Sequence, residues 1–173
     1  MAEPNPPAAE QARPASSSRS ELIRWMNITD ANGAGFVHGG VVMRMCDEVA
    51  GIAAIRHCGA RVVTAGMDRM TFSETVYVGE LIRCIASVNA VWRTSMEVGV
   101  RVEAENAVTR EVRHTSTAYL TMVAVNDHGK PIPVPPLAVS EEIERRRQRE
   151  AETRRRNRLA EREELLRHRS AED

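Results

Sequence analysis

The stretch that most constrains the fold is residues 38–58, which predict one long helix. Its apolar side chains recur at helical spacing and together cover most of the circumference of the predicted helix. A helix that is apolar on nearly all sides must be buried on several sides, so the rest of the chain has to enclose it. Four charged residues interrupt the apolar surface: Arg44, Asp47, Glu48 and Arg56.

The enclosing elements are predicted to be strands. Alternation of apolar and polar residues predicts three long strands in the second half of the chain and two shorter ones before them. Because the long strands follow one another with no helix between them, we expect an antiparallel sheet and an α+β fold. A sheet wrapped around one long central helix satisfies these periodicities, and so does a different α+β sandwich. The strands are expected at residues 22–28, 61–68, 79–91, 94–105 and 115–126.

The composition narrows the class of protein. The chain has 24 Lys and Arg against 24 Asp and Glu, so no global charge indicates a nucleic-acid or membrane partner. Three scattered cysteines form no disulfide framework and suit a reducing compartment. No apolar run is long enough to span a membrane, and no signal peptide is evident, so we expect a cytoplasmic protein. Neither metal-ligand spacing nor a glycine-rich phosphate loop is present, so no metal or cofactor is expected.

The length of 173 residues predicts one domain with two tails. Residues 1–20, rich in Pro, Ala and Ser, are expected to be disordered, and residues 21–139 to form the domain. Residues 140–173 are expected to be a solvated helix, because the interleaved acids cancel the field that a nucleic-acid tail needs. We expect residues 18–139 to fold and work without either tail. The predicted helical ion pairs are Glu141–Arg145, Glu142–Arg146, Glu150–Arg154 and Glu152–Arg156.

The acid pair in the middle of the apolar helix needs an explanation. A carboxylate packed against apolar side chains is unfavourable unless it is paired or protonated. The structural explanation for Asp47 is a salt bridge to Arg44, one turn earlier on the same face. Glu48 is best explained as half of an ion pair at an interface.

The loop before the helix favours a chemical role for Asp47. His38, Gly39 and Gly40 fall where the helix should begin, and the first amides of a helix are unsatisfied donors at its positive end. Such donors can polarise a carbonyl and hold an oxyanion. Asn32 adds an amide that can orient a carbonyl or a water molecule. Together with a carboxylate that activates water, these groups indicate a hydrolytic site for an acyl compound.

The residues also resemble a known family. "DANGAGFVHGGVVMRMCDEVAGIAAIRHC" is similar to the central signature of the hotdog acyl-CoA thioesterases, the group that includes the brain-type acyl-CoA hydrolase. The similarity continues through "VVTAGMDRMTF", "VGELI", "RTSMEVGVRV" and "TAYLTMVAVNDHGKPIPVPPL", and covers roughly residues 21–140. The resemblance implies the hotdog fold, hydrolysis of acyl-CoA to a fatty acid and CoA, and a homodimer that often builds to a hexamer.

The resemblance also implies roles for particular residues. Asn32 and Asp47 match the family's catalytic pair, which meets across a subunit interface. Asp47 then acts as a general base on water or as a nucleophile that forms a transient anhydride. Gly39 and Gly40 would donate backbone N–H groups to the thioester oxygen, with His38 in a supporting role.

The CoA-binding turn departs from the family pattern. The family's "GRTS" is "WRTS" here, with Trp92 in place of Gly. Arg93, Thr94 and Ser95 are the residues that the resemblance implies for the CoA phosphates, and Trp92 is the one departure from the family pattern in this turn.

Two other functions fit the same fold. A non-catalytic acyl-CoA-binding regulatory module would keep the ligand and lose the water-activating carboxylate, so Asp47 disfavours it. A hydratase or dehydratase would need a His–acid pair at the acyl chain, for which His38 is the candidate. The expected partners are acyl-CoA, CoA and further copies of the chain, with no nucleic acid and no membrane.

Overall fold

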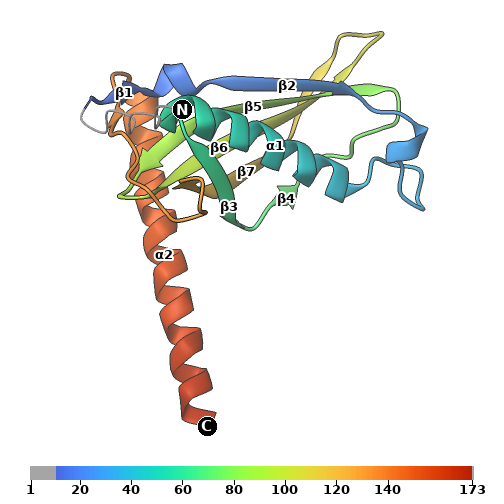
Figure 1. Ribbon diagram of the computed structural model, residues 1–173. Coiled ribbons are helices and arrows are strands. Elements are labelled where there is room, and N and C mark those ends of the chain that lie inside the picture. The colour runs from blue at the N-terminus through green and yellow to red at the C-terminus, as the bar shows by residue number, and fades with distance from the viewer. Residues whose placement is uncertain (1–10, 173) are drawn as a thin grey trace.

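The computed structural model describes residues 11–172 (Figure 1). Within them a sheet is ordered β2-β5-β6-β7-β3, with antiparallel neighbours and with β4 added beside β7, and a small parallel pair joins β1 to β8. The elements in chain order are β1 (Arg13–Pro14), η1 (Ala15–Ser18), β2 (Ser20–Trp25), η2 (Ile28–Asp30), α1 (Gly39–Cys58), β3 (Arg61–Met67), β4 (Thr71–Phe72), β5 (Glu80–Val91), β6 (Ser95–Asn106), β7 (Val112–Val125), β8 (Leu137–Ala138) and α2 (Glu142–Glu172).

The sheet curls around α1, which confirms the predicted fold (Figure 1). Val49, Ala50 and Ala53 of α1 are fully buried, and every second residue of β6 from Met96 to Ala104 faces them. This packing follows from the two periodicities, because a helix with apolar residues on most sides fills the groove that the apolar faces of the strands form. The helix ends at Gly59, whose positive φ of 68° caps it.

The predicted strand at residues 22–28 begins earlier and ends earlier than expected. β2 stops at Trp25 because Asn27 caps the short 3-10 helix η2, accepting from the backbone N–H of Thr29. Asn and Asp side chains compete for backbone N–H groups and so favour turns over strands. The other predicted strands agree with the structure to within three residues at each end.

The expectation of an N-terminal disordered tail is wrong for residues 11–20, and residues 1–10 lie outside the described part of the chain. The backbone N–H of Arg13 donates to Pro136, and its guanidinium donates to the carbonyl of His57 at 2.7 Å. The buried hydroxyl of Ser18 accepts the backbone N–H of Val88 at 2.9 Å. These hydrogen bonds, together with the buried Ala15, hold the segment against α1 and β5.

The expectation of a wholly solvated C-terminal helix is also wrong. α2 lies on the sheet face opposite α1, since it pairs with Glu97, which alternates with the core-facing Met96 and Val98. Glu97 is 0% exposed, and Arg154 of α2 lies 2.7 Å from it. Ala151 is also completely buried. Only the C-terminal part of α2, after Glu161, projects from the body (Figure 1).

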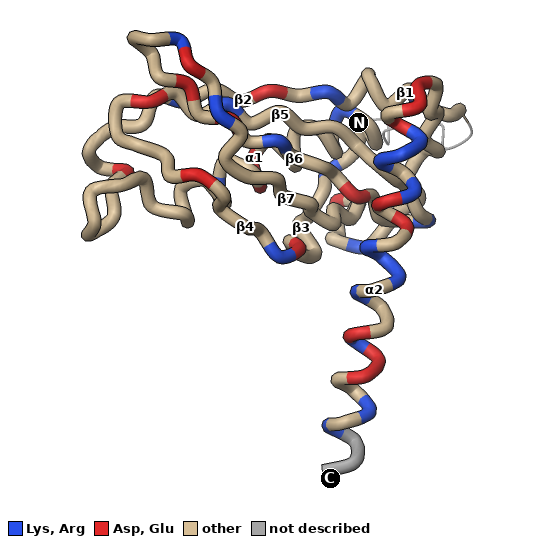
Figure 2. The backbone as a smooth tube through the Cα atoms, turned by 180° about the vertical axis from the view of Figure 1, so that it is seen from behind, with Lys and Arg blue, Asp and Glu red and all other residues tan. Residues whose placement is uncertain are grey.

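The charges on α2 pair differently from the prediction. Acidic and basic residues alternate along the helix (Figure 2), but among the described residues none of the four predicted pairs forms a salt bridge. Arg154 is the clearest case, because it leaves Glu150 for the buried Glu97. The pairs within α2 are Arg145–Glu142, Arg146–Glu150, Arg149–Glu142 and Arg167–Glu163.

Candidate active site

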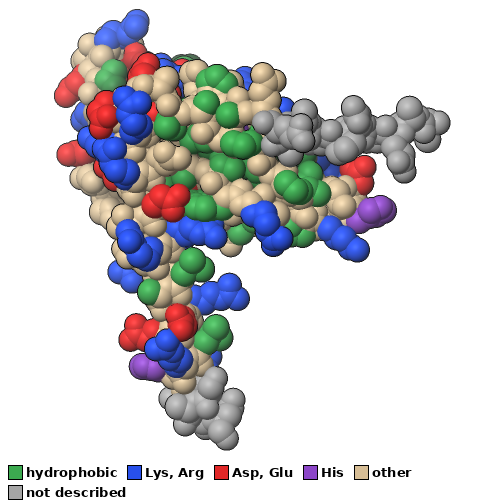
Figure 3. Space-filling view, turned by 90° about the vertical axis from the view of Figure 1, so that its left-hand side faces the viewer, with side chains coloured by type: hydrophobic (Ala, Val, Ile, Leu, Met, Phe, Trp, Pro, Cys, Tyr) green, Lys and Arg blue, Asp and Glu red, His purple; other side chains and the backbone are tan. Residues whose placement is uncertain are grey.

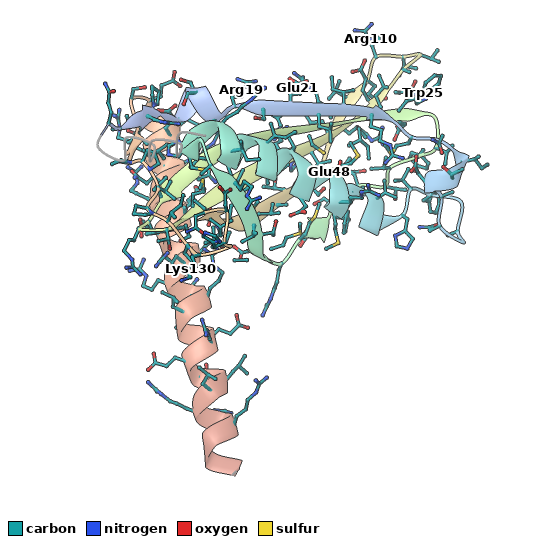
Figure 4. All side chains as sticks on the ribbon, viewed as in Figure 1. Arg19, Glu21, Trp25, Glu48, Arg110 and Lys130 are labelled. Carbon is teal, nitrogen blue, oxygen red and sulfur yellow. The ribbon has the colours of Figure 1, made fainter. Side chains whose placement is uncertain are left out.

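Asp47 makes its contact with a strand rather than with its own helix. The hydroxyl of Thr64, on β3, donates to Asp47 Oδ1 at 2.6 Å. The salt-bridge explanation is wrong, because Arg44 pairs with Glu48 at 2.9 Å (Figure 4 labels Glu48 on α1). Asp47 is also exposed in a single chain, whereas a buried carboxylate was expected. The Thr64 hydroxyl fixes one carboxylate oxygen and leaves the other available.

Thr64 is the site residue that the sequence patterns missed. A threonine in a strand is ordinary, so nothing in the local pattern distinguishes it. The register between β3 and β7 shifts between Thr64 and Gly66, which marks a β-bulge. Bulges re-aim side chains next to functional sites. Here the shift follows directly after the residue that reaches Asp47.

Asn32 sits in a tight loop that orients its side chain. Asn32 Oδ1 accepts the backbone N–H of Ala34 at 2.9 Å and of Phe36 at 3.3 Å. Because the oxygen must face these donors, the orientation of the amide group is determined. Its NH2 group has no hydrogen-bond partner in residues 11–172. The loop therefore presents a free, oriented donor.

A buried aspartate holds this loop against the start of α1. The Asp30 carboxylate accepts from the backbone N–H of Asn27 at 3.0 Å and from Arg24 at 2.5 Å. Its carbonyl accepts the N–H of His38 at 2.8 Å. The Asn32 loop and the first residue before α1 are thus fixed by one residue.

The two glycines at the start of α1 differ in whether their backbone N–H is free. His38 Nδ1 accepts the N–H of Gly40 at 2.9 Å and so caps the helix. The N–H of Gly39 has no partner among the described residues. A Cβ at Gly39 would lie 3.3 Å from the ring of Phe72, so a side chain there would crowd the ring. In this conformation Gly39 offers the available amide, and Gly40 does not.

The expected CoA-binding residues lie in the β5–β6 hairpin. The N–H of Trp92 donates to the carbonyl of Ser95 at 2.8 Å, and the carbonyls of Arg93 and Thr94 accept from Val134 and Ala124. In the described residues, Arg110 is the sole non-glycine with positive φ, so Trp92 occupies this turn without the strain that a glycine would avoid. Arg155 of α2 covers its ring at 4.3 Å. The hairpin therefore forms despite the lost glycine.

One chain does not bring these groups together. Phe36 of the Asn32 loop pairs with Tyr77, just before β5 begins, whereas the β5–β6 hairpin follows the other end of β5. β5 has 12 residues, so the two ends are on the order of 40 Å apart. Asp47 lies between them, about 12 Å along α1 from Gly39. Two grooves along α2 are lined by neither Asn32 nor Asp47.

An uncovered apolar surface flanks Asp47. We call it the β3–α1 face. β3 is an unpaired edge of the sheet, and Val63 on it is 50% exposed. Unpaired strand edges pair readily with other chains. The exposed apolar residues of this face are Met43, Ile52 and Ile55 of α1.

In the described part of the chain, no cluster of His, Cys, Asp and Glu side chains is suited to hold a metal ion. Its helices also include none with the length and apolar character of a membrane span.

The chain is similar to known thioesterases. The family model described as "Thioesterase superfamily" matches residues 34–110. A hexameric acyl-CoA thioesterase has a TM-score of 0.84 and 38% identity, with 87% of this chain and 97% of that chain covered. The acyl-CoA hydrolase of Staphylococcus aureus, solved with butyryl-CoA and CoA, has a TM-score of 0.83 and 30% identity, with 91% and 96% covered. Protein VdlD of Helicobacter pylori is 42% identical over 69% of this chain and 68% of its own length.

A sheet curled round one helix and these similarities define a hotdog-fold enzyme that cleaves thioesters. The chain belongs to the acyl-CoA thioesterases of the thioesterase superfamily.

Proposed function

We propose that this enzyme hydrolyses acyl-CoA to a fatty acid and CoA at sites shared by two copies of the chain. Asn32 and Gly39 come from one copy, and Asp47 with Thr64 from the other. The observation that carries the proposal is the 2.6 Å hydrogen bond from Thr64 to an exposed Asp47, beside an unpaired strand edge. The similar S. aureus enzyme was solved with butyryl-CoA and CoA, which supports the substrate class.

The chemistry follows from the groups that are free. Asp47 takes a proton from water, and the resulting hydroxide attacks the thioester carbon. The N–H of Gly39 and the amide of Asn32 hold the oxyanion, which collapses and expels the CoA thiolate. The thiolate then receives the proton from Asp47. Direct attack by Asp47 would instead give an anhydride that water opens, and the same two donors would serve it.

Variants of the S. aureus enzyme support the inclusion of Thr64. Single alanine variants of that enzyme have been solved at an asparagine, an aspartate and a threonine. These positions have the same mutual spacing along that chain as Asn32, Asp47 and Thr64 have here.

The shared site requires a dimer, for which the β3–α1 face is suited. Pairing of β3 with β3 of a second copy would continue the sheet and cover the apolar residues of that face. It would also bring each Asn32 loop toward the partner's α1. Because a similar thioesterase is hexameric, we propose a trimer of such dimers.

The β5–β6 hairpin is the proposed CoA-binding segment. Arg93 is exposed and has no carboxylate partner in the described residues, so its guanidinium is available to a phosphate group. Thr94 and Ser95 would add hydroxyl donors beside it.

The hydratase alternative is less well supported. His38 Nδ1 is already engaged as the helix cap, which leaves only Nε2 for proton transfer. The regulatory-module alternative would make no use of the Thr64–Asp47 pair.

The test is hydrolysis of palmitoyl-CoA and butyryl-CoA, followed with a thiol reagent that reports free CoA. We expect Asp47→Asn to lower kcat by about a hundred- to ten-thousand-fold, as for other general bases. Glu48→Gln, the adjacent carboxylate on α1, is the matched control and should remain active. An Asp47→Asn enzyme with most of its turnover would overturn the proposal.

A further inference from the structure

α2 crosses the outer face of the sheet strand by strand. Arg154 pairs with Glu97 on β6 and lies 3.6 Å from the ring centroid of Tyr119 on β7. One turn further on, Arg158 pairs at 2.5 Å with Asp68, directly after the edge strand β3. These contacts anchor the helix as far as the last strand of its own chain.

Beyond that strand the helix continues without a sheet beneath it. Among the described residues, Glu161 makes the last ion pair between α2 and the body, with Arg69 at 3.5 Å. Residues 162–172, which we call the overhang, then extend about 16 Å further. Figure 1 shows the overhang projecting away from the sheet.

The docked side of α2 continues into the overhang. Ala151, Arg154 and Arg158 dock at helical spacing, and Leu165 follows on the same side, two turns after Arg158. Leu165 is 54% exposed. With Met67 it lines a groove of about 960 Å3 under the helix, next to the β3 edge. Apolar side chains are visible on the projecting part in Figure 3.

We propose that the overhang docks on the outer face of a second copy's sheet. This proposal rests on the proposed pairing of β3 with β3. If that pairing continues the sheet at about 4.8 Å per strand, the 16 Å overhang spans about three strands of the second copy. The sheet of the second copy would then occupy the groove beside Met67.

The outer face of the second copy's sheet carries an apolar patch on which Leu165 can pack. Thr64 points toward α1, so the adjacent Val63 points to the opposite, outer face. Val123 of β7 is its partner in the register, and Ser95 of β6 is the next partner across. The overhang would therefore cover Val63 and Val123 of the second copy and end toward that copy's proposed CoA-binding hairpin.

The charge of the overhang favours a protein surface over other occupants. Residues 162–172 carry three arginines against three glutamates, so the overhang has no field for nucleic acid or anionic lipid. The exposed apolar side chain of Leu165 is then the part of the overhang that a protein surface would bury.

The experiment uses full-length chains with single cysteines on different copies. Leu165→Cys chains and Val63→Cys chains, with tags of unequal size, are co-expressed and treated with a short bismaleimide. We expect a crosslinked band of the mixed size only when both variants are present. The matched control is Arg167→Cys, which lies on the opposite side of the same overhang and pairs with Glu163. It should give no band with Val63→Cys.

A second measurement does not depend on crosslinking. Leu165→Glu should raise the dissociation constant of the assembly at least several-fold in sedimentation experiments, while Arg167→Glu should not. Absence of both effects in an assembled, active enzyme would overturn the overhang proposal and leave the proposed function intact. Absence of acyl-CoA hydrolysis in the wild type would overturn the proposed function, whatever the crosslinks show.

Discussion

At the scale of single residues, the site depends on which polar atoms are already engaged. The N–H of Gly40 donates to His38 Nδ1, and the side-chain oxygen of Asn32 accepts two backbone N–H groups. The groups left over are the N–H of Gly39 and the amide of Asn32, both donors. A thioester carbonyl is an acceptor, so the free atoms complement the substrate.

His57 makes stability depend on pH. Its side chain is fully buried, and burial is the main reason that its pKa is lowered; Nε2 donates to the carbonyl of Pro135 at 3.0 Å. The folded protein therefore holds His57 neutral to a lower pH than the unfolded chain, which binds a proton below a pH of about 6.5. The stabilising effect is fully present above that pH and is lost as the pH falls from there toward the lowered pKa.

We expect the free energy of unfolding in urea to fall between pH 7.5 and pH 5 by up to about 1.4 kcal/mol per pH unit. His57→Gln should show a shallower slope over this window, and His114→Gln, at an exposed histidine, should keep the wild-type slope. Equal slopes in wild type and His57→Gln would contradict this account.

At the scale of elements, α2 is part of the folded body rather than a solvated tail. Its arginines neutralise Glu97, a carboxylate with no exposure to water. Arg155 also covers Trp92 in the proposed CoA-binding hairpin. The earlier expectation that residues 18–139 suffice is therefore revised.

Truncation after Val139 should destabilise the protein by about 3–5 kcal/mol, because it removes both arginines that contact Glu97. The measurement is the urea midpoint of the truncated and the full chain. Glu97→Gln should recover part of the loss in the truncated chain and weaken the full chain. Truncation after Glu161, which keeps the anchoring contacts, should lower the free energy of unfolding much less than truncation after Val139. Equal stability of all forms would show that α2 does not support the sheet.

At the scale of the whole molecule, the candidate groups lie too far apart in one chain to form a site. A two-fold dimer has two identical composite sites. The cytoplasmic location that the composition indicates stays a prediction.

Mixed assemblies test the shared site. Asn32→Ala and Asp47→Ala chains, each inactive alone, are co-expressed with different tags. A mixed dimer has one intact site and one that lacks both residues. Random pairing makes half of the dimers mixed, so about a quarter of wild-type activity should return. Activity no higher than that of either variant, with mixed assemblies shown to be present, would contradict a site shared between copies.

Much of the architecture followed from local pattern. The apolar circumference of residues 38–58 predicted an enclosed helix, and strict alternation predicted the strands that enclose it. The turn chemistry around Asn32 and the glycines marked the candidate site. Such features depend on residues within a few positions of one another, so the sequence is sufficient to predict them.

Other features depended on which distant segments meet. In the alternation of β6, Glu97 falls at a position that is normally exposed to solvent, yet α2 buries it. Thr64 is an ordinary strand residue until the β3 register places its hydroxyl against Asp47, 17 positions away along the chain. Periodicity assigns a side chain to a face but does not state what covers that face. That is decided by the packing of elements in three dimensions, because burial and pairing arise only there.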